Sequence, residues 1–148
     1  MIQLIGLKHD VKIDIREKLS IIPKRQERSL SALANICDEA VILSTCNRIE
    51  IYFKSKDEDI VKKIFRALNW DETLIECVFN YKGEKAIQHL MEVVCGFDSL
   101  LLGEDQVLGQ VRDAYEVAKD SGATKKEFQR LFENAIACGK KFRTKSKT

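Results

Sequence analysis

The spacing of apolar residues switches between two periods along the first half of the chain, and this restricts the folds open to it. Three segments are short apolar runs and a fourth alternates apolar and polar residues, both typical of strands. These strand candidates cover 2–7, 40–43, 48–54 and 77–81. Between them, helical spacing of apolar residues occurs over 24–37 and 57–68. The order strand, helix, strand, strand, helix, strand predicts a ferredoxin-like α+β fold with an antiparallel four-stranded sheet.

Local signals support both helices and the strand over 48–54. Pro23 suits a first helical turn, and Ser55 is expected to cap the helix over 57–68. Within 48–54 one face would carry Ile49, Ile51 and Phe53, and the other Glu50 and Tyr52. That alternation predicts a strand.

The second half of the chain is predicted to be helical. A helical pattern runs from about 84 to 121, with an interruption expected near 96–103. Residues 121–124 combine a helix stop with a new cap, and a last helix follows over 125–142. We therefore expect a ferredoxin-like part at 1–83 and a helical part at 84–148.

Composition excludes several classes of protein. The chain has 148 residues, 45% hydrophobic and 32% charged, which suits one globular domain rather than a disordered protein. Its formal charge of +2 does not indicate a polybasic protein, and no apolar run approaches the roughly 20 residues of a membrane span. No signal peptide is visible at the N-terminus. Five Cys without a CxxC pair argue against a disulfide framework or zinc ribbon, so a reducing, cytoplasmic compartment is expected.

Residues 44–48, Ser-Thr-Cys-Asn-Arg, form a short connection between two strand candidates. Cys46 is expected to be accessible there, whereas Cys37 and Cys95 occupy positions expected to be buried in helices. Arg48 is two residues further on, and a nearby guanidinium favours the thiolate, which is the nucleophilic form of cysteine. The alternative is a cysteine packed as a small hydrophobe beside an ordinary hairpin.

A second set of polar or small residues would form one stripe if the helical half were continuous. Its members are His89, Gly96, Ser99, Gly103, Gln106 and Gln110. Such a stripe between apolar neighbours can line a polar pocket, or it can be a close helix–helix contact. Glu104 and Asp105 have a simpler explanation as acidic residues near a helix start.

Two further features carry weaker signals. The C-terminal basic run resembles a solvated helix end more than an RNA-binding surface, because Phe142 is its one aromatic residue. His9 follows the first strand, where a site role and a loop role are equally compatible with the sequence.

Four blocks of the chain resemble the N-terminal catalytic domain of glutamyl-tRNA reductase, in the order of that family and over the whole chain. They are Gly6-Leu7-Lys8-His9 with Ile15-Arg16-Glu17-Lys18-Leu19; Ser44 to Tyr52; Gly96 to Leu100 with Gly103 to Val111; and Leu131-Phe132, Ala135, Gly139-Lys140 and Arg143-Thr144. The second and third blocks are the specific ones.

The resemblance implies a reaction and a nucleophile. The family reduces the glutamate of glutamyl-tRNA to glutamate-1-semialdehyde with NADPH, the first committed step of the five-carbon route to tetrapyrroles. Cys46 would attack the aminoacyl ester and hold the glutamyl group as a thioester, which hydride from NADPH then reduces.

The resemblance also implies the residues around the substrate. Thr45, Asn47 and Arg48 would flank it, and we expect Arg48 to pair with the γ-carboxylate of the glutamyl group. Glutaminyl-tRNA would then be rejected, because its amide leaves the guanidinium uncompensated. The other substrate-contacting block would supply Ser99, Glu104, Asp105, Gln106 and Gln110, with Glu104 a candidate for the substrate ammonium. His89 matches a family His important for activity, which would orient the ester or assist proton transfer.

The chain departs from the family in two respects. Lys8 stands where Asn is usual. Its seven Gly contain no GxGxxG, so an NADPH-binding domain is expected to be absent from it. The resemblance implies a homodimer formed through a further C-terminal domain, and an aminomutase is the partner expected for the next step. No metal is implied. A chain that forms the thioester without reducing it would act as a glutamyl-tRNA deacylase.

Three other functions remain open at this stage. A non-catalytic tRNA-binding module would not need Cys46. A cysteine hydrolase of another acyl ester would turn over small glutamate esters and ignore tRNA. A purely structural α+β domain would need neither Cys46 nor the polar stripe.

Overall fold

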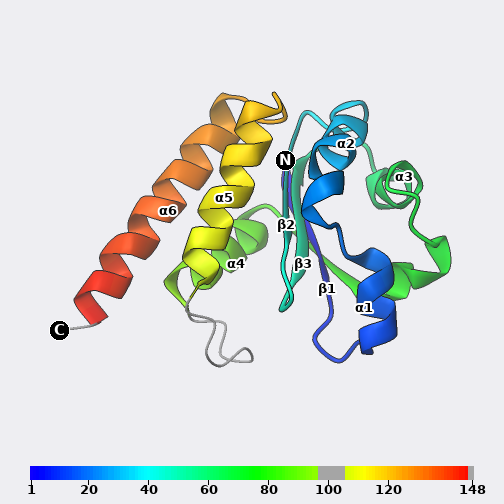
Figure 1. Ribbon diagram of the computed structural model, residues 1–148. Helices are drawn as coiled ribbons and strands as arrows, with labels where there is room; N and C mark the ends of the chain where they lie inside the picture. The colour runs from blue at the N-terminus through cyan, green and yellow to red at the C-terminus, as the bar shows by residue number, and fades with distance from the viewer. Residues whose placement is uncertain (97–105, 147–148) are drawn as a thin grey trace.

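The computed structural model describes residues 1–96 and 106–146. Its strands are β1 (Ile2–Leu7), β2 (Glu39–Ser44), β3 (Ile49–Lys54) and β4 (Val78–Lys82). They form one sheet in the order β2-β3-β1-β4, with all neighbours antiparallel (Figure 1). Two helix-containing crossovers flank the β2–β3 hairpin, so the ferredoxin-like α+β prediction is confirmed.

Helices cover both faces of this sheet. One layer contains α1 (Ile13–Leu19), α2 (Pro23–Ala34) and α3 (Ile60–Ala67), and the 3₁₀ helix η1 (Glu72–Cys77) leads from it into β4. The other layer contains α4 (Glu84–Cys95), α5 (Val107–Asp120) and α6 (Lys126–Ser146). Figure 1 shows the sheet edge-on between the two layers.

Because of this double cover, both faces of the strand over 48–54 are buried. Residues 49–53 are all buried, including Glu50 and Tyr52. The alternation of polar and apolar residues is real, but the polar face lies under α4–α6 rather than in water. A buried strand face tolerates a carboxylate only if that carboxylate is hydrogen-bonded and charge-paired, and Glu50 is both, as described below.

The helix boundaries differ from the sequence predictions at four places, one of which is the end of α6 at Ser146 rather than 142. The seven-residue α1 was not predicted, because Leu19 is its one buried residue and gives no apolar stripe. Helix α2 ends at Ala34 rather than 37. Helix α3 begins at Ile60 rather than 57, and the prediction that Ser55 caps it is wrong: its N-cap is Asp59, and Ser55 Oγ accepts the N–H of Asp57 (3.0 Å) in the preceding turn.

The predicted interruption of the long helical segment is confirmed. Helix α4 ends at Cys95, and Gly96 caps it with a left-handed φ of +80°, which favours glycine. Residues 97–105 lie outside the described residues, and α5 begins at Val107. The predicted polar stripe is therefore divided, because His89 and Gln110 belong to different helices. The described residues contain no helix that is both long and apolar enough to span a membrane.

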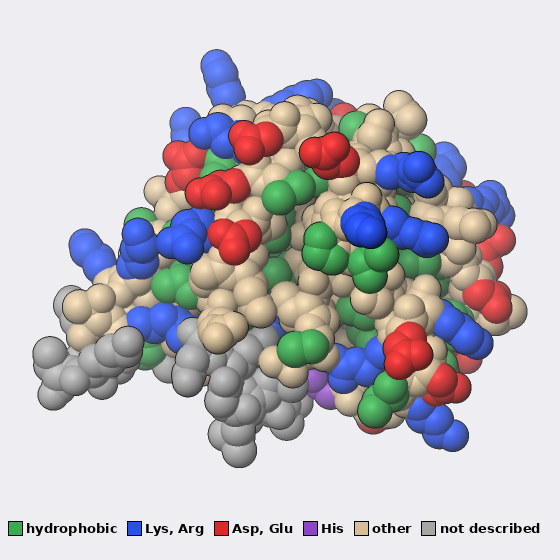
Figure 2. Space-filling model, in the orientation of Figure 1, with side chains coloured by type: hydrophobic (Ala, Val, Ile, Leu, Met, Phe, Trp, Pro, Cys, Tyr) green, Lys and Arg blue, Asp and Glu red, His purple; other side chains and the backbone are tan. Residues whose placement is uncertain are grey.

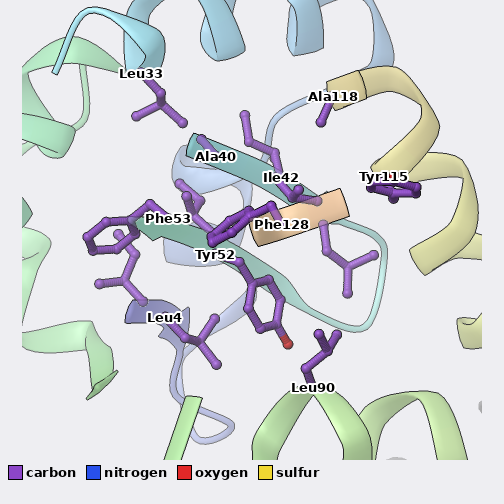
Figure 3. Close-up of a cluster of buried hydrophobic side chains, with 14 of the residues drawn as sticks. Leu4, Leu33, Ala40, Ile42, Tyr52, Phe53, Leu90, Tyr115, Ala118 and Phe128 are labelled. Atoms are coloured by element: carbon purple, nitrogen blue, oxygen red, sulfur yellow. The ribbon is translucent and has the colours of Figure 1, made fainter. Parts of the chain in front are cut away.

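One hydrophobic core joins the sheet to the C-terminal helices. Buried residues of β1–β3 meet those of α4–α6, as Figure 3 shows for Leu4, Tyr52, Leu90 and Phe128. The ring of Tyr52 stands edge-on to Phe132 of α6, with centroids 5.5 Å apart. The sheet face under α4–α6 is thus held firmly, and this face carries the polar groups described next.

Candidate active site

Cys46 lies at the tip of the β2–β3 hairpin and is exposed to solvent. The neighbouring Thr45 holds the turn: its N–H donates to the Arg48 carbonyl (2.8 Å), and its Oγ1 accepts the N–H groups of Asn47 (3.2 Å) and Arg48 (3.1 Å). A Thr side chain that accepts backbone N–H groups in this way stabilises a tight turn. The prediction that Cys46 is accessible is therefore confirmed.

Cys37 and Cys95, both expected to be buried, differ in their exposure to solvent. Cys37 is buried, just beyond the end of α2, and burial together with Asp38 raises the pKa of its thiol to about 12. Such a thiol stays protonated and unreactive at neutral pH. Cys95 is only half-buried, at the last residue of α4, so the expectation of burial was wrong for that residue.

Arg48 points into the protein from the same hairpin. Its side chain is 3% exposed, and one guanidinium nitrogen donates to Glu50 Oε2 at 3.0 Å. Residues i and i+2 of a strand share a face, which brings these two side chains together on the α4–α6 side of the sheet. In the sequence Arg48 stands out as a neighbour of Cys46, and the pairing with Glu50 was not predicted.

Glu50 is the centre of a buried polar network. Besides Arg48, it accepts a hydrogen bond from the hydroxyl of Tyr52 (3.1 Å) and lies 2.7 Å from Nε2 of His89. Burial by itself would raise the pKa of Glu50. The hydrogen bond from His89, the charges of His89 and Arg48 and the hydrogen bond from Tyr52 outweigh burial, so the pKa lies below its ordinary value. Glu50 is therefore an ionised acceptor at neutral pH.

His89 of α4 is fixed by this carboxylate and by two aromatic rings. Because an ionised carboxylate can only accept, Nε2 of His89 carries the proton of their hydrogen bond, and Nδ1 is the ring nitrogen that can gain or lose one. The imidazole centroid lies 5.5 Å from that of Phe79 and 5.6 Å from that of Tyr81, both on β4. His89 is thus positioned on three sides.

Gly6 makes room for this arrangement. In the sheet register Gly6 lies between Glu50 on β3 and Phe79 on β4. A Cβ at this position would clash with Cζ of Phe79. The ring that packs against His89 therefore crosses the space left by the missing side chain.

We expect Gly6→Ala to lower the free energy of unfolding by about 1–3 kcal/mol, because the Phe79 ring must move. Urea denaturation of the two proteins measures the difference. In a Phe79→Ala background the same substitution should cost much less. An equal cost in both backgrounds would show that the contact with Phe79 is not the cause.

A pocket of about 660 Å³ opens beside the thiol, between α2 and α5 at the edge of the sheet. Thr45, Cys46 and Gln110 line one part of it, and Ile42, Leu43 and Val117 contribute apolar wall. Figure 2 shows apolar side chains in the hollow between α5 and α2. Its volume falls in the usual range for small-ligand sites. Gln110 and the Cys46 loop thus line the same pocket.

The remaining predicted site residues divide between described and undescribed parts of the chain. Gln106 is exposed at the N-cap of α5. Ser99, Glu104 and Asp105 lie outside the described residues. One residue that the sequence analysis did not assign to the site contacts it: Arg16 of α1 donates to the carbonyl oxygen of Cys46 at 3.3 Å. The signal that could have found Arg16 in the sequence is its place in one of the four blocks that resemble the family.

Fold and geometry together define a ferredoxin-like α+β domain with an exposed thiol on a hairpin, beside a buried Arg–Glu–His network. Residues 5–146 match the family model for the N-terminal domain of glutamyl-tRNA(Glu) reductase. The chain belongs to this family, as the four sequence blocks indicated.

Individual relatives agree with this assignment. The chain is 51% identical over 146 residues to the glutamyl-tRNA reductase of Clostridium acetobutylicum, covering 97% of this chain and 37% of the relative. It is 50% identical to that of Clostridium perfringens, covering 99% and 38%. The solved glutamyl-tRNA reductase of Methanopyrus kandleri superposes with a TM-score of 0.78 at 25% identity, over 97% of this chain and 34% of that one. The chain thus spans less than two fifths of the length of these relatives.

Proposed function

We propose that this chain carries out the acyl-transfer step of a glutamyl-tRNA reductase, with Cys46 as the nucleophile. The thiolate attacks the ester carbonyl of glutamyl-tRNA, a C–S bond forms, and the C–O bond to the terminal ribose breaks. The leaving oxygen takes up a proton, and the glutamyl group remains on Cys46 as a thioester. The observation that carries the proposal is the exposed thiol on a Thr45-held turn at the mouth of a pocket.

Arg48 is proposed to bind the γ-carboxylate of the glutamyl group. One guanidinium nitrogen of Arg48 pairs with Glu50 at 3.0 Å, and the planar guanidinium has further N–H groups that match a second carboxylate. Thr45 and Asn47 flank the ester from the turn, and Gln110 contacts the substrate from the wall of the pocket. Gln106 belongs to the same proposed set, as do Ser99, Asp105 and Glu104, the last for the substrate ammonium.

His89 is proposed to act through a proton at Nδ1, because Nε2 is committed to Glu50. Loss of a proton from the thiol or gain of one by the leaving ribose oxygen are the two steps it would serve. A role in orienting the ester is the other possibility that its fixed position supports.

The described residues do not fit an NADPH site. Dinucleotide binding of the usual kind needs a parallel βαβ unit with a glycine-rich loop. The sheet of residues 1–96 and 106–146 is antiparallel throughout, and the sequence contains no GxGxxG. Reduction of the thioester to glutamate-1-semialdehyde is therefore proposed for the whole enzyme and not for these residues. Homodimerisation, a cytoplasmic location and product transfer to an aminomutase are proposals of the same kind.

The test is to incubate the chain with labelled glutamyl-tRNA without NADPH and to analyse the denatured protein by mass spectrometry. We expect a glutamyl adduct on Cys46 that is absent from Cys46→Ser and retained by Cys138→Ser, a matched control because Cys138 is also exposed. Release of free glutamate by the wild type alone would indicate deacylation through the same thioester. The absence of both an adduct and released glutamate would contradict the proposal.

Comparing the turnover of glutamyl-tRNA with that of a small glutamyl ester distinguishes the alternative functions. A reductase domain should prefer glutamyl-tRNA strongly, whereas a general acyl-ester hydrolase should turn over the small ester equally well. A tRNA-binding module would bind tRNA and leave both esters intact.

A further inference from the structure

A second pocket, of about 320 Å³, lies on the other side of α2, next to α1 and the turn after α3. Its lining contains three cationic side chains, Lys18, Arg25 and Arg28, with Ser20, Ser29 and Asn69 as further polar groups, and no carboxylate. Figure 2 shows Lys and Arg side chains gathered over α2 and toward α3. A concave surface with one sign of charge concentrates counter-ions, here anions.

The three cationic side chains have no charged partner within the described part of the chain. Among residues 1–96 and 106–146, none of them forms an ion pair or a side-chain hydrogen bond, whereas the neighbouring Arg66 donates to Glu72 at 3.1 Å. Asp71 feels the charge of Lys18, but its Oδ1 already accepts the N–H and the hydroxyl of Thr73 (2.9 and 2.8 Å). The fold therefore leaves three positive charges around one polar concavity.

This pocket is connected to the thiol loop through the start of α2. The helix separates it from the pocket beside Cys46, since α2 contributes Lys24 and Glu27 to one and Arg25 and Arg28 to the other. Ile21 lines the cationic pocket, and its N–H donates to Ser44 Oγ (3.0 Å), two residues before Cys46. The width of one helix, roughly 10 Å with its side chains, thus separates the two pockets.

We propose that this pocket binds a backbone phosphate of the tRNA close to its aminoacylated 3′ end. The inference rests on the proposed function, because a strand whose last ribose reaches Cys46 must carry its preceding phosphates along an adjacent surface. Guanidinium groups match phosphate oxygens in geometry as well as charge. Binding here does not depend on base sequence, and it orients the ester toward Cys46.

The test is to measure the affinity of uncharged tRNA(Glu) by fluorescence anisotropy at several salt concentrations, for the wild type and for Arg25→Ala/Arg28→Ala. We expect affinity to fall roughly tenfold at low salt, and the slope of log K against log salt to become shallower by about one unit per lost phosphate contact. The matched control is Lys140→Ala/Lys141→Ala, which removes two exposed charges from α6.

The control should bind within about twofold of the wild type. If instead the α6 variant loses affinity and the α2 variant does not, the RNA lies at the C-terminal basic run and the proposal is wrong. Equal losses in both variants would show a diffuse charge effect and would also overturn it.

Two further measurements are needed. One distinguishes an RNA phosphate from a free anion, and the other distinguishes failure of this proposal from failure of the proposed function. Inorganic phosphate at millimolar concentration should compete weakly with an acceptor-stem minihelix. Phosphate binding that Arg25→Ala/Arg28→Ala abolishes while minihelix affinity stays unchanged would point to a free anion and overturn the RNA assignment. Because uncharged tRNA is bound without thiol chemistry, failure of Cys46 to form a thioester would leave this measurement intact. The α2 variant should still be acylated normally by a small glutamyl ester.

Discussion

The Glu50→Gln variant is expected to lose about 3–5 kcal/mol of unfolding free energy, the usual effect of removing one partner from a buried ion pair. Arg48 and Glu50 are 3% and 4% exposed, so water cannot solvate the guanidinium left behind. Gln keeps the shape of Glu but not its charge, and the loss therefore measures the charge itself. Chemical denaturation at neutral pH reports it directly.

The pH dependence gives an independent check with a definite sign. The pKa of Glu50 is lower in the folded protein than in the unfolded chain, so its ionisation stabilises the fold. That contribution is fully present above the ordinary value of 4.5 and disappears as the pH falls through the lower, folded pKa. The stability difference between wild type and Glu50→Gln should be constant near pH 7 and shrink steadily below about pH 4.5.

Two controls make this result specific. Glu72→Gln removes an exposed pairing with Arg66 and should cost less than about 1 kcal/mol. Arg48→Met/Glu50→Gln leaves no uncompensated charge and should recover part of the lost stability. A Glu50→Gln protein as stable as Glu72→Gln would contradict the role given to the buried network.

Arg48→Lys is expected to reduce acyl transfer from glutamyl-tRNA and to erode the discrimination against glutaminyl-tRNA. Lysine keeps the charge but loses the planar pair of donors that binds a carboxylate bidentately. A charge-assisted hydrogen bond contributes roughly 1.5–3 kcal/mol, so kcat/KM should fall by about ten- to a hundredfold. Single-turnover measurements with both aminoacyl-tRNAs give the rate and the selectivity.

The fold of this variant must be verified by its circular dichroism and denaturation midpoint, because Arg48 also pairs with Glu50. Unchanged selectivity in a folded Arg48→Lys protein would exclude Arg48 as the group that reads the γ-carboxylate. The adduct on Cys46 could then still form, so this outcome would leave the nucleophile assignment standing.

Most of the fold was predictable from local patterns. Strand and helix periods gave the order of elements, since side-chain spacing follows directly from backbone geometry. Other features of the fold depend on contacts between residues far apart in the chain. Glu39 of β2 is an example: its carboxylate accepts the N–H groups of Lys125 and Phe128 (3.1 Å for the latter) and so caps the start of α6. No local pattern indicates a cap supplied from 86 residues away.

The candidate site shows the same division. The hairpin position of Cys46, and hence its exposure, follows from the two flanking strands. Arg48 and Glu50 were separately visible in the sequence, and their spacing of two already places them on one strand face. What the pattern does not contain is the second helical layer, which buries that face and turns two apparently solvated charges into a buried pair.

The sequence by itself determined the order of the elements, the family and the residue offered as nucleophile, because each depends on neighbours along the chain. Only the tertiary structure decided which groups surround that nucleophile. It joined Arg48, Glu50 and His89 across a strand and a helix, brought Arg16 to the Cys46 loop, and gathered Lys18, Arg25 and Arg28 around one pocket. Burial and electrostatic pairing are properties of packing in three dimensions, and packing brings together residues that no spacing rule along the chain connects.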